Sequence, residues 1–120
     1  MPYLTVDYSS HLAGTFDRAA LVKELHPLVV EESGTRGVCK TLFRPAETYV
    51  GDRPCEEAAF VHVEVGLMPG RPEALKARLS EGVLALLEKH LRVEGVPPDA
   101  VFSVEVRDLT GSYRLSPSAR

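Results

Sequence analysis

The sequence lacks any excess of basic residues. Its 14 Lys and Arg residues are outnumbered by 17 Asp and Glu residues, which gives a formal net charge of −3. Nucleic-acid-binding domains usually carry a basic patch, and here the cations are spread along the chain, so we expect no nucleic-acid partner. The chain also lacks a basic start followed by an apolar run, and any stretch apolar enough to cross a bilayer. We therefore expect a cytoplasmic protein without membrane contact.

Cysteine is scarce as well. Cys39 and Cys55 are the only two cysteines, and neither belongs to a Cys-x-x-Cys pair. A structural zinc site normally needs four ligands at close spacing, whereas the histidines stand singly, at positions 11, 26, 62 and 90. These observations predict neither a bound metal nor a disulfide.

What the chain does have is the composition of an ordinary globular domain. Of its 120 residues, 44% are hydrophobic and 26% are charged, which argues against disorder. That length is sufficient for a two-layer core but leaves no room for a second domain. We predict a single domain over residues 1–120.

Hydrophobic periodicity predicts the element order β-α-β-β-α-β. Alternation indicates strands over residues 2–8, 38–44, 59–66 and 100–106. Helical spacing indicates one helix from a cap at Gly14-Thr15 to Ser33-Gly34, kinked at Pro27. A second helix is expected to begin at Pro72, a good first helical residue, and to carry an apolar stripe as far as Leu91, and Pro97-Pro98 ends that segment.

Each half of the chain has the spacing of a parallel βαβ unit. We predict an α+β fold in which two βαβ units form a four-stranded mixed sheet with two helices on one face. A ferredoxin-like sandwich has the same element order, and only the long link between the second and third strands argues against it. The uncovered face would be regular and polar, with Thr5, Asp7, His62, Glu64, Ser103 and Glu105.

The second residue is a candidate catalytic group. Removal of Met1 would leave Pro2 as a free secondary amine at the start of a strand. A terminal amine titrates near ~8 in model peptides, and desolvation lowers that pKa because it disfavours the charged form. Leu4 and Val6, on the same side of the strand, would supply the apolar surroundings. Pro2 could thus be a neutral general base, although many unrelated proteins also begin Met-Pro.

A positively charged residue lies at the expected start of the second helix, where a positive charge is unfavourable. Arg71 precedes Pro72, at the positive end of the second helix dipole. Free backbone N–H groups together with a guanidinium would bind a carboxylate or a phosphate there, and the alternative is a side chain that points into water. Lys40 and Arg44, on one face of the second strand, would line a site for an acidic ligand or form a solvated edge.

Together these features resemble a known family. Met1-Pro2 before a strand, a helix with an internal proline, the string Ala59-Phe60-Val61-His62-Val63 and the pair Gly70-Arg71 are similar to 5-carboxymethyl-2-hydroxymuconate delta-isomerase, of the tautomerase superfamily. The resemblance covers nearly the whole chain and weakens after Val106. It implies two βαβ units joined in one sheet, a homotrimer, and a cofactor-independent isomerase of a small carboxylate substrate.

The resemblance also assigns roles to single residues. Pro2 matches the catalytic proline, and Arg71 matches the arginine that binds or polarises the acidic substrate. Lys40 and Leu42 stand where the family has two arginines, so this chain departs from the pattern in its second strand. Lysine keeps the charge but loses the bidentate fork. We expect Arg44, on the same face, to supply the missing charge.

The implied reaction converts a 2-hydroxymuconate-type dienol to its unsaturated 2-oxo form, with Pro2 as the base. Two other functions stay open. A protonated Pro2 would suit a hydratase or dehalogenase acting on an unsaturated acid, and a retained Met1 would favour a non-catalytic ligand-binding module with a ferredoxin-like fold. The polar tail from Asp108, which includes Leu109, Tyr113 and Leu115, is expected to lie along the sheet edge of a neighbouring subunit.

Overall fold

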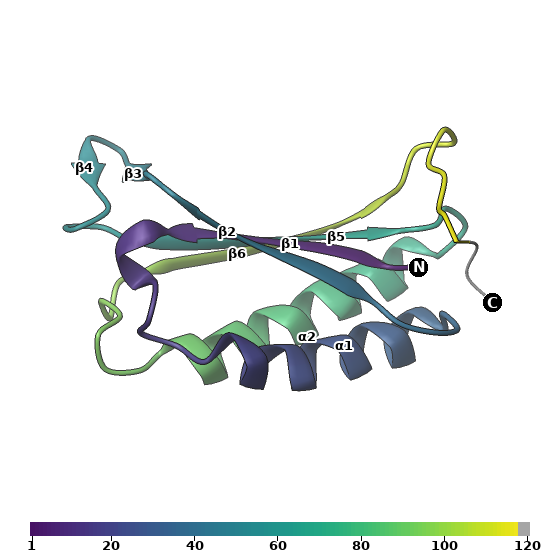
Figure 1. Cartoon of the computed structure of the whole chain (residues 1–120), viewed down its shortest axis with the longest axis horizontal. Coiled ribbons are helices and arrows are strands. Elements are labelled where there is room, and N and C mark those ends of the chain that lie inside the picture. Colours follow the sequence, from purple (N-terminus) through teal and green to yellow (C-terminus); the bar gives the residue numbers. More distant parts are fainter. Residues whose placement is uncertain (118–120) are drawn as a thin grey trace.

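A four-stranded sheet with both long helices against one face makes up most of the molecule (Figure 1). A computed structural model describes residues 1–117. Its elements in chain order are β1 (Tyr3–Ser9), the 3₁₀ turn η1 (Ser10–Leu12), α1 (Arg18–Ser33), β2 (Lys40–Ala46), β3 (Tyr49–Val50), β4 (Arg53–Pro54), β5 (Phe60–Leu67), α2 (Glu73–Leu91) and β6 (Val101–Asp108). Neither long helix is long and apolar enough to cross a membrane.

The strand order is β2-β1-β5-β6, with β3 and β4 forming a separate small hairpin. Strand β1 pairs in parallel with β2, and β5 pairs in parallel with β6, whereas the central pair β1–β5 is antiparallel. Each parallel pair is joined through a helix, so the two βαβ units predicted from the sequence are confirmed. A ferredoxin-like sandwich would split each unit by placing another strand between its two strands, and this sheet has neither split.

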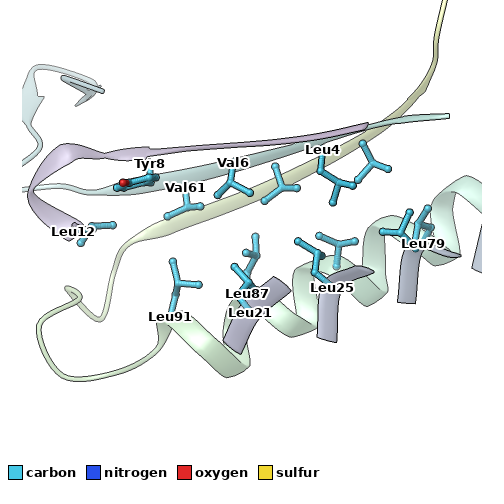
Figure 2. Packing of buried hydrophobic residues seen from close by; sticks show 14 of the residues in the cluster. Leu4, Val6, Tyr8, Leu12, Leu21, Leu25, Val61, Leu79, Leu87 and Leu91 are labelled. Carbon is cyan, nitrogen blue, oxygen red and sulfur yellow. The ribbon is translucent and has the colours of Figure 1, made fainter. Parts of the chain in front are cut away.

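The core lies between the sheet and the helices. Alternate side chains of β1 and β5 point toward the helices. From the other side, α1 and α2 each pack a stripe of leucine and valine side chains against them (Figure 2). At most 1% exposed are Leu4, Val6, Tyr8, Leu21, Leu25, Val29, Val61, Val63, Val65, Leu79, Val83, Leu87 and Leu91. The apolar stripe expected for the second helix is therefore confirmed, except that Leu75 and Leu86 are only half-buried.

The first helix differs from its prediction in where it begins. It begins at Arg18, because Asp17 is the N-cap and its carboxylate accepts the Ala20 N–H at 3.0 Å. Thr15 instead bonds Leu12 O in the preceding turn. The helix also continues unbroken through Pro27, which is exposed, so water can hydrate the carbonyl group whose N–H partner proline lacks. It ends as predicted, at left-handed Gly34.

Ion pairs join the two helices on their outer side. Glu24 of α1 accepts a hydrogen bond from Lys89 Nζ of α2 at 2.6 Å and also contacts His90 Nε2. The bond from Lys89, followed by that from His90, lowers the pKa of the Glu24 carboxyl below its ordinary value of 4.5. Because folding favours the charged carboxylate, its stabilising contribution is fully present above that ordinary pKa and is lost as the pH falls through the folded pKa.

We expect Glu24→Gln to lower the free energy of unfolding at neutral pH and to change it little in acid. Urea unfolding across a pH series from ~7 to ~3 would measure the gap between variant and wild type. Glu81→Gln, an exposed glutamate of α2 outside every ion pair of the described residues, is the control and should show no such pH-dependent gap. A Glu24→Gln gap of constant size across the series would contradict the prediction.

Candidate functional site

One end of the molecule gathers most of the residues that the sequence singled out. The N-terminus, the end of α1, the start of β2, the end of β5 and the start of α2 all meet there (Figure 1). This follows from the topology, since β1 and β2 start at the same end and the antiparallel strand β5 finishes there. Pro2, Lys40 and Arg71 therefore belong to one region, whereas Arg44 lies four residues further along β2.

Pro2 lies directly before β1 and is bonded to the neighbouring strand β2. Its carbonyl accepts the Lys40 N–H at 3.2 Å, and the register of β1 with its neighbours places Pro2 between Cys39 and Leu67. Pro2 is buried, as are both of these neighbours. Burial raises the pKa of the Cys39 thiol, and the positive amino terminus nearby opposes that rise. The start of the chain thus lies in surroundings poor in water.

Arg71 is anchored to the end of the first helix. Its Nε donates to Ser33 O at 3.1 Å, its Nη1 to Met68 O at 3.0 Å and its Nη2 to Thr35 Oγ1 at 3.1 Å. Ser33 is the last residue of α1, so its carbonyl belongs to the negative end of that helix dipole. The cation that is unfavourable at the start of α2 is therefore balanced by the end of α1. This partner could not be found in the sequence, because it depends on how the two helices pack.

The two cations of β2 have different surroundings. Lys40 Nζ lies over the rings of Tyr3 and Tyr113, at 5.2 and 5.5 Å from their centroids. Arg44 instead donates from Nε and Nη2 to the two carboxylate oxygens of Asp7, at 2.8 and 3.0 Å. This hydrogen-bonded pair raises the pKa of Arg44 above its ordinary value. Both side chains are on the open face, but only Lys40 belongs to the end where Pro2 lies.

The open face carries the predicted polar residues in three registered rows. Leu42, Thr5, Glu64 and Glu105 form one row, and Arg44, Asp7, His62 and Ser103 form the next. The row nearest the N-terminus is Lys40, Tyr3, Gly66 and Arg107. Ligand atoms of His62, Glu64 and Glu105 lie within 4.8 Å of one another and could approach a metal ion together. Since Glu64 already pairs with Arg107 and His62 with Ser103, we assign them to the charge network of the sheet.

The C-terminal segment covers part of this face. Leu109 N donates to Leu67 O at 2.7 Å, and the Leu109 side chain fills the space that Gly66 leaves, where a Cβ atom would lie 2.6 Å from Leu109 Cδ2. Under the segment is a cavity of about 250 Å³, whose lining includes Tyr3, Arg107 and Tyr113. The structure places Leu109 and Tyr113 against their own chain, and the expected contact of the tail with a neighbouring subunit stays a prediction.

Comparison with known proteins gives a consistent result. A family model described as 5-carboxymethyl-2-hydroxymuconate isomerase matches residues 2–118. Among solved structures, the chain is similar to a 5-carboxymethyl-2-hydroxymuconate isomerase from Deinococcus radiodurans R1, with a TM-score of 0.78 and 22% identity over 95% of this chain and 88% of that one. No curated protein gives a significant match.

Two further structures support the fold. One is a 5-carboxymethyl-2-hydroxymuconate delta-isomerase, with a TM-score of 0.75 and 19% identity over 98% of this chain and 89% of that one. The other is a fused 4-OT described as a wild type symmetric trimer, with a TM-score of 0.74 and 22% identity over 98% of this chain and 94% of that one. At these identities the structural similarity establishes the architecture.

We expect Arg71→Ala to lower the free energy of unfolding by about 1–3 kcal/mol, because a buried helix-end carbonyl and two other acceptors lose a charged donor. Denaturant unfolding would measure the loss. Arg78→Ala is the matched control, since this arginine of α2 also contacts α1, through one exposed ion pair with Glu32, and should cost about 0–1 kcal/mol. Equal effects of the two substitutions would show that the anchoring of Arg71 adds nothing.

Proposed function

Because the chain belongs to the 5-carboxymethyl-2-hydroxymuconate isomerase family, we propose that it converts a 2-hydroxymuconate-type dienol to the unsaturated 2-oxo acid, with Pro2 as the general base. 5-Carboxymethyl-2-hydroxymuconate or the enol of a related 2-oxo acid is the proposed substrate. The observation that carries the proposal is the place of Pro2, which is buried beside the central strand and next to a strand that begins with a cation.

The proposed reaction moves one proton. Once Met1 is removed, the Pro2 nitrogen is a secondary amine among Cys39, Leu67 and Leu4, and burial of this kind lowers an amine pKa toward neutrality. The neutral nitrogen takes the proton of the 2-hydroxyl group. The C2–O bond becomes a carbonyl, the double bonds shift along the chain, and the same proton returns to a conjugated carbon. Since the proton only changes place, the reaction needs no cofactor.

We assign carboxylate binding to Lys40 and Arg71. A guanidinium has five N–H donors, and the three bonds of Arg71 leave two of them for a substrate oxygen. The start of α2 adds to this site, because its N-cap Pro72 makes no side-chain cap bond and first-turn N–H groups there can face an anion. Arg44 is a weaker candidate, because a substrate carboxylate would have to compete with Asp7 for the paired N–H donors of the Arg44 guanidinium.

We also propose that the protein is a homotrimer with active sites between subunits. The open face of the sheet is not wholly polar, since Leu42 and Val101 are 48% and 49% exposed on it. A face that combines paired charges with exposed aliphatic residues suits contact with other copies. A similar structure is described as a symmetric trimer, which supports three copies.

Intact-mass measurement of the active protein should show the loss of Met1. Pro2→Ala should lower kcat/KM for enol-keto conversion of a 2-hydroxydienoate by at least roughly tenfold, because a positioned base contributes about 100-fold or more and a primary amine is a different and less constrained base. Pro45→Ala, which changes an exposed proline of β2, is the control and should retain activity. Active protein that keeps Met1 would exclude Pro2 as the base, and hydration or dehalogenation without enol-keto conversion would replace the proposed reaction.

Light scattering at micromolar concentration should give three times the 13.1 kDa of one chain. Replacing Leu42 by Glu on the open face should shift that mass toward the monomer, because it introduces a charge into the proposed interface. Leu84→Glu, at a leucine exposed on α2 away from the sheet, is the control and should leave the mass unchanged. A wild-type monomer would contradict the trimer.

A further inference from the structure

One residue of α1 contacts the start of β2 at two points. The His26 imidazole Nε2 and the Thr41 hydroxyl oxygen are 2.6 Å apart, and the Cys39 thiol donates to the His26 carbonyl at 3.8 Å. Within residues 1–117, the bond to Thr41 is the one side-chain hydrogen bond between α1 and β2. His26 therefore joins the helix to the short segment from Cys39 to Thr41.

The same segment holds Pro2. Lys40, between Cys39 and Thr41, donates its N–H to the Pro2 carbonyl at 3.2 Å. In the parallel register Thr41 lies opposite Leu4, which is completely buried on the helix side of the sheet. A continuous chain of contacts thus runs from an imidazole of α1, through the first residues of β2, to the residue that carries the proposed base.

This edge of the sheet is less closely covered than the other edge. Strands β2 and β6 each pair with one neighbour only. Helix α1 lies less close to β2 than α2 lies to β6. A hydrogen bond from α1 at this place therefore limits how far the first residues of β2 can move away from β1.

The contact between imidazole and hydroxyl group needs no charge. Burial lowers the pKa of the His26 imidazole below its ordinary value of 6.5, so the ring is neutral at neutral pH. A neutral imidazole has one donor and one acceptor nitrogen, and the Thr41 hydroxyl can serve as partner to either. The bond is therefore available at the pH at which the Pro2 amine has to be neutral.

Loss of this contact would change the Pro2 nitrogen through its hydration. Pro2 is buried beside Cys39 and Leu67, and burial disfavours the ammonium form of an amine. If the start of β2 moved away, water would reach the nitrogen, and its pKa would rise toward the value near ~8 of a free terminal amine. Less of the neutral base would then be present at neutral pH.

We propose that His26 is a positioning residue for the Pro2 base and acts through Thr41 and the start of β2. His26 takes no part in the proton transfer. It keeps the first residues of β2 against Pro2 and so keeps water away from the amine. The inference rests on the proposed function, because it concerns the protonation of the same nitrogen.

The test measures the amine itself. In mature protein that contains isotope-labelled proline, an NMR titration gives the pKa of Pro2 without turnover, and the acid limb of kcat/KM for a 2-hydroxydienoate gives it with turnover. Thr41→Val keeps the β-branched shape but removes the hydroxyl group, and it should raise this pKa by about one unit. Thr41→Ser keeps a hydroxyl group and should retain the wild-type value.

Two further variants separate the site from the fold. His26→Leu breaks the same bond from the helix and should raise the Pro2 pKa equally, and combining it with Thr41→Val should add nothing further. Thr48→Val is the structural control, because Thr48 is buried beyond the other end of β2 and its hydroxyl group bonds Ser9. This variant should lower the melting temperature and leave the Pro2 pKa unchanged.

The outcomes distinguish the inference from the proposed function. An unchanged Pro2 pKa in Thr41→Val, or an equal rise in Thr48→Val, overturns the inference, and turnover by wild type retains the function in that case. A raised pKa in Thr41→Val, in a protein that converts no dienol, retains the inference and removes the function. A Pro2 nitrogen blocked by retained Met1 overturns both.

Discussion

The pairing of β1 on both of its edges is the constraint on which the rest of the structure depends. Chain termini usually fray because little holds them, but here the first residues enter the middle of a sheet. Pro2 bonds β2 through its carbonyl, and Leu4 just beyond it is completely buried. A group at the start of this chain is therefore held almost as firmly as a core residue, and this is what a base at a terminus requires.

The same pairing decides what each cation of β2 can do. On sequence alone Lys40 and Arg44 are equivalent, since both alternate onto one face. The parallel register places Lys40 beside Tyr3 and Arg44 beside Asp7, so one cation meets an aromatic ring and the other a carboxylate. A shift by one residue would move both to the helix side. Lys40 is therefore the cation of β2 that has no carboxylate partner in the described residues.

Local patterns predicted the parts of the fold that depend on local burial. The alternating valines of β5, the stripe of α2 and the polar open face follow from side-chain periodicity, and each is found. The prediction for the start of α1 was wrong because Asp17, not Thr15, caps the helix. Thr15 instead bonds Leu12 in the preceding turn. Pro27 does not break α1, and the kink expected there stays a prediction. The three acceptors of Arg71 and the place of Tyr113 come from distant segments, so no spacing in the sequence indicates them.

Arg71 shows how such distant contacts shape the site. Because α1 and α2 run in opposite directions (Figure 1), the carbonyl end of one lies beside the amino end of the other. Arg71 donates a hydrogen bond to the carbonyl of Ser33, the last residue of α1, and so neutralises the negative end of the α1 dipole. Without that bond, the negative end of α1 would repel a carboxylate that approaches the start of α2. In the proposed site, Arg71 would therefore favour an acidic ligand in two ways, through its remaining N–H groups and by neutralising the negative end of α1.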